Sequence, residues 1–158
     1  MQTDYLIVGV GNTLRGDDGA GPALAERLAG ALRKSGAHVR VRCVQQLLPE
    51  LAAEVAELAP AALVIADCQA DAQASALRRL EGNPAAQGVG SHGLTPDHLL
   101  ALAVRLYEFG GAGWLATVPG VDFAHGEGLS ERTQQAIVAA APDMADQLMA
   151  QPAEQLAP

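Results

Sequence analysis

The chain has few cysteines, and their arrangement limits the kinds of protein it can be. It contains Cys43 and Cys68, which lie far apart and form no CxxC pair. A disulfide-stabilised fold, or a zinc site of closely spaced thiolates, needs more cysteines than this. The sequence therefore predicts two buried thiols in a protein of a reducing compartment.

Basic residues are also scarce. The 10 lysines and arginines stand against 18 aspartates and glutamates, which gives a formal net charge of -8. Nucleic acids and anionic membranes bind positively charged surfaces, so this balance argues against both as partners. It is compatible with a partner protein that is basic or that carries a metal ion.

The sequence also lacks segments that direct a protein to or through a membrane. The start of the chain, from Met1 to Tyr5, has no basic region of the kind found in a secretory signal peptide. No apolar run approaches the roughly 20 residues that cross a bilayer. We expect a soluble, cytoplasmic monomer. Its 158 residues suit one domain, which we expect over residues 1–150, followed by a flexible tail over 151–158.

Hydrophobic patterning predicts strands that alternate with helices. The expected strands cover residues 5–10, 38–44, 62–66, 75–80 and 114–118. The expected helices begin at Asp17 or Asp18, Pro49, Thr95 and Ser130, and one of the two aspartates caps the first of them. This order is typical of an α/β fold, a three-layer sandwich in which helices flank a mainly parallel, twisted sheet.

The order of the strands brings acidic residues to one edge of this sheet. If the first strand lies between the second and the third, the strand order reverses beside the first and third, where such sheets bind ligands. Asp17 and Asp18 follow the first strand, and Asp67 ends the third. His92, in a glycine-flanked loop before a helix, adds an imidazole. Two carboxylates and an imidazole suit Ni²⁺ or Zn²⁺, and they could also polarise a water molecule for hydrolysis.

Each of these residues also has an ordinary structural interpretation. An aspartate before a helix can cap it, an acid at a strand end can fix a turn, and a loop histidine is often solvated. We interpret His38, His98 and His125 as solvated or structural residues. Cys68 follows Asp67 directly, but no histidine stands near it in the sequence to activate the thiol.

The glycine-rich segment from Gly9 to Gly21, GVGNTLRGDDGAG, follows the first strand, where many folds bind a phosphate. Leu14 stands where a dinucleotide fingerprint needs its third glycine. Gly16 is followed by two aspartates instead of the Lys-Ser or Lys-Thr of a P-loop. Because two carboxylates would repel a phosphate, the sequence argues against a nucleotide-binding regulator.

The same segment resembles the signature of the hydrogenase maturation endopeptidases. Shorter matches follow in the family's order along nearly the whole chain, at 64–67 (Val-Ile-Ala-Asp), 91–94 (Ser-His-Gly-Leu) and 126–130 (Gly-Glu-Gly-Leu-Ser). The resemblance implies a five-stranded sheet. It also implies an endopeptidase that removes the C-terminal extension from the large-subunit precursor of a nickel-iron hydrogenase.

The resemblance further implies that Asp18, Asp67 and His92 are catalytic residues that contact a nickel ion, which the precursor itself carries. Asp17 and Asn12 are candidates for positioning these groups, and Asn12 equally suits a turn. Residues 44–50 depart from the family's glycine- and threonine-rich loop, which is thought to touch the substrate. The same three residues would also serve a nickel-binding chaperone of hydrogenase assembly that has no proteolytic activity.

Overall fold

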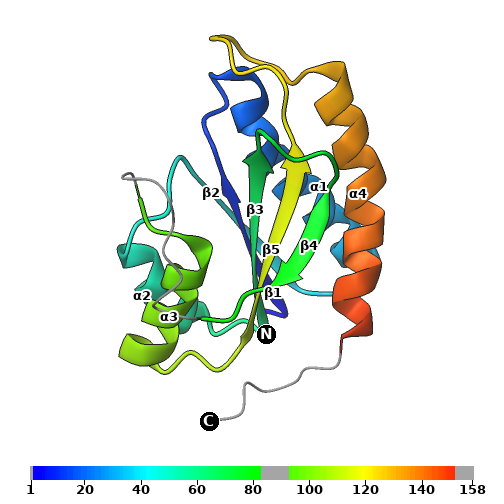
Figure 1. The fold of residues 1–158 in the computed structure, drawn as a ribbon. Coiled ribbons are helices and arrows are strands. Elements are labelled where there is room, and N and C mark those ends of the chain that lie inside the picture. The colour runs from blue at the N-terminus through cyan, green and yellow to red at the C-terminus, as the bar shows by residue number, and fades with distance from the viewer. Residues whose placement is uncertain (1, 83–92, 152–158) are drawn as a thin grey trace.

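Strands and helices alternate along the chain, and the computed structural model describes residues 2–82 and 93–151 of it (Figure 1). The elements are β1 (Tyr5–Val10), the 3-10 helix η1 (Gly16–Gly19), α1 (Ala20–Lys34), β2 (Val39–Val44), α2 (Glu50–Leu58), β3 (Ala62–Gln69), β4 (Ala76–Arg79), α3 (Pro96–Tyr107), β5 (Ala112–Pro119) and α4 (Glu131–Ala150). His92, the residues 83–91 before it, and residues 152–158 of the predicted tail lie outside the described residues.

Five strands form one sheet in the order β2-β1-β3-β5-β4. β1, β2, β3 and β5 run parallel, and β4 runs antiparallel to β5. Because β1 lies between β2 and β3, the strand order reverses beside β1 and β3, as the sequence predicted. The prediction of a mainly parallel sheet of five strands is confirmed.

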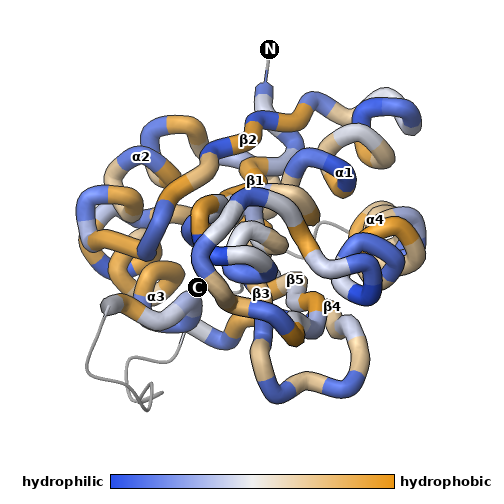
Figure 2. Tube along the Cα trace, turned by 90° about the horizontal axis from the view of Figure 1, so that it is seen from above, coloured by the Kyte–Doolittle hydropathy of each residue, from blue (hydrophilic) through white to orange (hydrophobic). Residues whose placement is uncertain are grey.

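Helices cover both faces of the sheet (Figures 1 and 2). α1 and α4 lie on one face, and α2 and α3 lie on the other. Alternate residues of β1 serve the two faces: Ile7 packs with α1 and α4, whereas Leu6 and Val8 pack with α2 and α3. Strands that are buried on both faces read as continuous apolar runs, which is why β1 and β3 were readily predicted. The three-layer sandwich is therefore confirmed.

β3 is longer than the sequence predicted. It continues through Asp67 to Gln69 because β5 continues beside it, with Asp67 opposite Thr117 and Gln69 opposite Pro119. Asp67 thus lies within the strand, near its carboxyl end, and not in the turn after it. The weakly patterned segment 75–80 does form a strand, β4, at the edge of the sheet.

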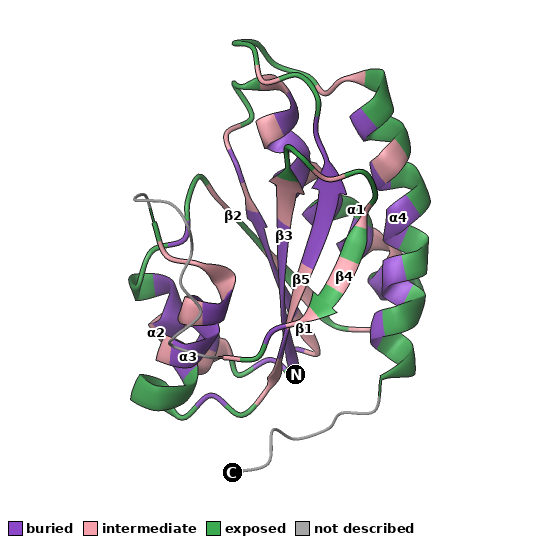
Figure 3. Cartoon of the chain, viewed as in Figure 1, coloured by how far each residue is buried: buried purple, intermediate pink, exposed green. Residues whose placement is uncertain are grey.

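The edge strands β2 and β4 are more exposed than the central strands (Figure 3). Val39 and Val41 of β2 pack against the core under α1, but Cys43 is exposed. Cys68 is half-buried, and both thiols are free. The prediction of two buried thiols is therefore wrong for Cys43, because an edge strand has a neighbour on one side only. None of the helices in the two described ranges is both long and apolar enough to span a membrane.

Candidate functional site

The turn after β1 directs the chain back across the end of the sheet. Gly11 has a φ of 148°, and a Cβ at this position would overlap the carbonyl oxygen of Asp18. A residue with a side chain would not allow this close approach. The Gly11 N–H donates to the carbonyl oxygen of Val44 at 3.0 Å, which fixes the turn against the end of β2. The turn therefore brings η1, with its two aspartates, to the carboxyl ends of the strands.

Asp18 is partly exposed and is held by the turn before it. Its Oδ2 accepts a hydrogen bond from the backbone N–H of Asn12 at 2.8 Å. The Asn12 Oδ1 in turn accepts a hydrogen bond from the backbone N–H of Leu14 at 2.9 Å. Asn12 thus closes the turn with its side chain and orients the Asp18 carboxylate with its backbone.

Asp67 lies near the end of β3, where its Oδ1 accepts a hydrogen bond from the backbone N–H of Cys68 at 2.8 Å. The pKa of Asp67 is raised from its ordinary value of 3.8 to about 6. Burial is the largest cause, the negative charge of Asp18 adds to the rise, and the hydrogen bond from the Cys68 N–H opposes it. The carboxylates of Asp18 and Asp67 therefore lie close enough to repel each other. The structure brings these two predicted site residues together, and their role there stays a prediction.

Each of these two carboxylates has one oxygen that no described residue binds. Asp18 Oδ1 and Asp67 Oδ2 accept no hydrogen bond from any residue that the structure describes. Carboxylate oxygens suit divalent cations, and a cation between them would relieve their repulsion. Within residues 2–82 and 93–151, no three His, Cys, Asp or Glu side chains form a group that could hold a metal ion. His92, the third predicted ligand, lies outside these ranges.

Asp17 has quite different surroundings and is fully buried. Its carboxylate accepts hydrogen bonds from the backbone N–H groups of Val121, Asp122 and Ser130 and from the Ser130 hydroxyl, at 2.8, 2.9, 2.7 and 2.8 Å. Burial alone would raise the pKa of Asp17, but these four hydrogen bonds outweigh it and lower the pKa to about 2. Asp17 is therefore ionised at neutral pH and serves as an anchor for the loop after β5.

Backbone hydrogen bonds join the same two segments. The Asp17 N–H donates to the carbonyl oxygen of Asp122 at 2.7 Å. The Gly126 N–H donates to Leu14 at 2.9 Å, and the Gly126 carbonyl oxygen accepts from the Gly16 N–H at 3.0 Å. The turn after β1 and the loop after β5 therefore form one hydrogen-bonded unit.

The predicted cap of the first helix is wrong. α1 begins after Gly19, with no side-chain hydrogen bond at its N-cap, because the carboxylates of Asp17 and Asp18 are bound by other donors. Ser130 does cap α4, as predicted, by accepting a hydrogen bond from the Thr133 N–H at 3.3 Å. The contact between Ser130 and Asp17 spans 113 residues, and the sequence contained no signal for it.

Cys68 is unsuited to act as a nucleophile. Burial, together with the negative charges of Asp67, Asp17 and Asp18, raises the pKa of its thiol to about 12. A thiol that stays protonated at neutral pH reacts slowly, since the thiolate is the reactive form. This finding agrees with the sequence, in which no histidine stands near Cys68.

The three histidines that the sequence predicted to be solvated or structural lie in separate parts of the chain. His38 is exposed beside β2, and its N–H donates to Asp4 Oδ2 at 2.8 Å. His98 lies in the first turn of α3, where its N–H donates to Thr95 Oγ1 at 3.1 Å. His125 is exposed in the loop after β5. Among the described residues, none of the three joins a group that could hold a metal ion.

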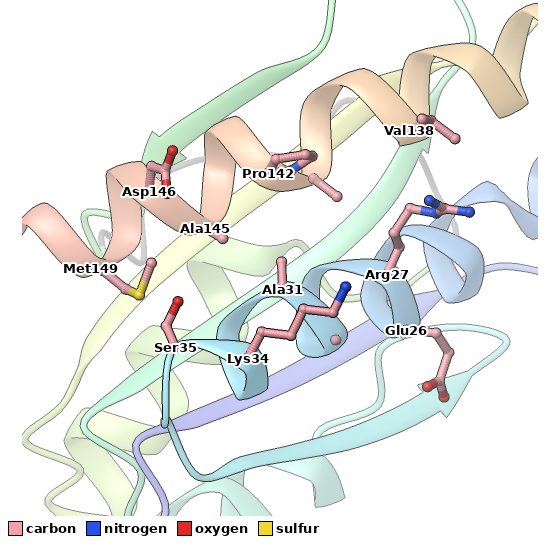
Figure 4. Close-up of a pocket in the computed structure, with 12 residues that line it drawn as sticks. Glu26, Arg27, Ala31, Lys34, Ser35, Val138, Pro142, Ala145, Asp146 and Met149 are labelled. Atoms are coloured by element: carbon pink, nitrogen blue, oxygen red, sulfur yellow. The ribbon is translucent and has the colours of Figure 1, made fainter.

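A separate groove of about 620 Å³ lies between α1 and α4 (Figure 4). Arg27 and Lys34 of α1 and Asp146 of α4 stand along it, and Ala31 and Ala145 lie between the two helices. No carboxylate from the ends of β1 or β3 lines this groove. The groove is therefore distinct from the candidate site.

Comparison with solved structures identifies proteins of the same fold. The structure is similar to the [NiFe] hydrogenase maturation protease HycI from Thermococcus kodakarensis, with a TM-score of 0.67, 19% identity and 94% of each chain covered. It is similar to the hydrogenase maturating endopeptidase HybD from Escherichia coli, with a TM-score of 0.64, 21% identity, and 94% of this chain and 93% of that one covered. For the endopeptidase HycI from Escherichia coli the TM-score is 0.67 at 21% identity, with 99% and 97% covered.

No protein-family model matches the sequence, and comparison with curated proteins finds no relative. The similarity to the solved structures extends over nearly the whole chain, and at these identities it establishes the fold. That fold is the one implied by the resemblance of residues 9–21 to the maturation endopeptidase signature.

We predict that the Asp67 carboxyl group titrates near pH 6 and that Asp18→Asn lowers its pKa, because the substitution removes a neighbouring negative charge. ¹³C NMR of the aspartate carboxyl carbons measures both values. Asp146→Asn, on the exposed side of α4, should leave the titration of Asp67 unchanged. An Asp67 pKa near 4 would contradict its burial, and an Asp67 pKa that Asp18→Asn does not move would contradict its proximity to Asp18.

We predict that Asp17→Ala lowers the free energy of unfolding at pH 7 by at least about 3 kcal/mol, because four donors lose their acceptor. Since folding lowers the pKa of Asp17 from 3.8 to about 2, its ionised form stabilises the fold above about pH 4. This contribution is lost as the pH falls through about 2, so the difference between Asp17→Ala and the unmodified protein should shrink there. Urea denaturation at several pH values tests this, and an equal difference at all pH values would refute it.

Proposed function

We propose that this protein is an endopeptidase that removes the C-terminal extension from a nickel-loaded large-subunit precursor during [NiFe]-hydrogenase maturation. The observation that carries the proposal is the pair of repelling carboxylates, Asp18 and Asp67, at the strand-order reversal of this fold. The solved structures with this fold include proteins described as [NiFe] hydrogenase maturation proteases. His92 is proposed as the third contact to the precursor's nickel.

The acidic character of the site supports a cation as the group that it recognises. The charge of Asp18 raises the cost of ionising Asp67, and one oxygen of each carboxylate has no hydrogen-bond partner among the described residues. A divalent cation carried by the substrate would bind these oxygens and stabilise both charges. The glycine-rich turn then needs no phosphate ligand. Its glycines let the backbone fold tightly, and its aspartates bind a cation.

Hydrolysis of the peptide bond follows from the same placement. Docking of the precursor's nickel against Asp18 and Asp67 would hold the scissile bond in a fixed orientation. One route is that a carboxylate of the site accepts a proton from an attacking water. The precursor's nickel could instead polarise the scissile carbonyl.

We predict that the protein trims a nickel-loaded precursor and leaves the nickel-free precursor intact. Asp18→Asn, Asp67→Asn and His92→Ala should each slow trimming by about 100-fold or more, because each removes a proposed contact to the reacting site. Mass spectrometry of the large subunit after incubation measures the loss of the extension. Circular dichroism checks that each variant is folded.

Asp146→Asn serves as the control for a change of charge away from the site, and it should trim at the normal rate. Normal trimming by the three site variants would show that the site is assigned wrongly. Tight nickel binding by the isolated protein, without cleavage of any precursor, would instead favour a nickel chaperone. Isothermal calorimetry with Ni²⁺ provides that measurement.

A further inference from the structure

Three large apolar side chains are exposed at the carboxyl ends of the strands. Leu14 follows β1, Leu48 follows β2 and Val121 follows β5, and their exposed fractions are 55%, 48% and 53%. Because these strands are parallel, the loops that follow them lie at the same edge of the sheet (Figure 1). We call these three residues the apolar rim.

The apolar rim flanks the two carboxylates of the candidate site. Leu48 lies in the loop after β2, and Val121 lies in the loop after β5. In the strand order, β2 and β5 stand on opposite sides of the neighbouring strands β1 and β3, which lead to Asp18 and Asp67. Leu14 stands in the same turn as Asp18. The loops that carry these apolar residues therefore lie on both sides of the β1–β3 junction.

The backbone of each rim residue is hydrogen-bonded into the fold. The Val121 N–H donates to the buried Asp17 carboxylate at 2.8 Å, and the Leu14 carbonyl oxygen accepts from the Gly126 N–H at 2.9 Å. The Leu48 carbonyl oxygen accepts a hydrogen bond at 3.0 Å from the first turn of α2. The exposed side chains therefore project from fixed positions, which lowers the entropy cost of binding a partner there.

Three exposed apolar side chains on the loops around an ionic site offer a surface that a partner could cover. Burying one such side chain stabilises a complex by roughly 1.5–3 kcal/mol. A free metal ion or a short polar peptide would leave the rim in water. A folded protein that presents a cation within an apolar surface would cover the rim and neutralise the carboxylates together.

We infer that Leu14, Leu48 and Val121 form the docking surface for the folded precursor and contact an apolar surface around its cation site. This inference rests on the proposed function and adds how the partner is held. Leu48 lies within residues 44–50, where the chain departs from the family pattern, so this part of the rim contributes to the choice of precursor. Recognition of the precursor then has two components. The carboxylates bind its metal ion, and the apolar rim contacts the protein surface around that ion.

The test uses the full chain with Leu14→Ser, Leu48→Ser and Val121→Ser, singly and combined. Microscale thermophoresis measures binding to the nickel-loaded precursor, and mass spectrometry measures KM and kcat for trimming. Each single substitution should weaken binding about tenfold and raise KM to a similar extent, which corresponds to about 1.4 kcal/mol. Thermal unfolding should be nearly unchanged, because exposed positions contribute little to stability.

Leu106→Ser is the matched control. Leu106 is a leucine that is 64% exposed near the end of α3, away from the loops that follow the parallel strands. It should bind and trim as the unmodified protein does. Unchanged binding by the combined rim variant would overturn the inference.

Measuring precursor binding and precursor cleavage separately also distinguishes the docking surface from the endopeptidase proposal. If the unmodified protein binds the precursor through the rim but never cuts it, the docking surface stands and the endopeptidase proposal fails. If it cuts normally and the rim variants bind and cut normally, the endopeptidase stands and the docking surface fails. If the unmodified protein does not bind the nickel-loaded precursor at all, both proposals are refuted.

Discussion

The hydrogen bonds that the buried Asp17 carboxylate accepts hold the candidate site together. They connect the turn after β1 with the loop after β5 and with Ser130 at the start of α4. A buried charge is costly unless it is hydrogen-bonded, and charge-assisted bonds to several donors more than offset that cost here. Because Asp18 follows Asp17 directly, the same hydrogen bonds hold its backbone in place. The Asp18 carboxylate can therefore keep a fixed position while it stays partly exposed at the carboxyl ends of the strands.

Three aspartates in one region have three different environments. Asp17 is buried among donors and its pKa falls to about 2, whereas Asp67 is partly buried near another acid and its pKa rises to about 6. Asp18 accepts one backbone hydrogen bond and adds its charge to the field at Asp67. One carboxylate therefore supports the structure, and the other two keep oxygens for a ligand. Neighbouring acids whose surroundings give them different pKa values are common at catalytic sites.

Local patterns predicted the parts of this protein that local interactions determine. β1 has the predicted bounds, because a short apolar run followed by a glycine-rich turn is typical of a buried strand. Ser130 caps α4, as its place before the helix predicted. The sequence did not predict the extension of β3 past Asp67, since that depends on pairing with β5. The sequence predicted that Asp17 or Asp18 caps the first helix, whereas the long-range contact with Ser130 shows that Asp17 is a buried anchor instead. The placement of Asp18 beside Asp67 followed from topology, whereas His92 lies outside the described residues.

The exposed thiol of Cys43 makes this edge of the sheet open to chemical labelling. Cys43 pairs with Gly9, which in turn pairs with Ala66, so it lies level with the residue before Asp67 and two strands away. Partial desolvation of the thiol and the charge of Glu26 raise the pKa of Cys43, although Arg42 opposes the rise, so maleimide coupling will proceed best in mildly alkaline buffer. Cys68 is more strongly protonated and half-buried, so it will couple more slowly. A fluorophore on Cys43 would thus sit next to the candidate site, and in air the same thiol would link two molecules unless a reductant is present.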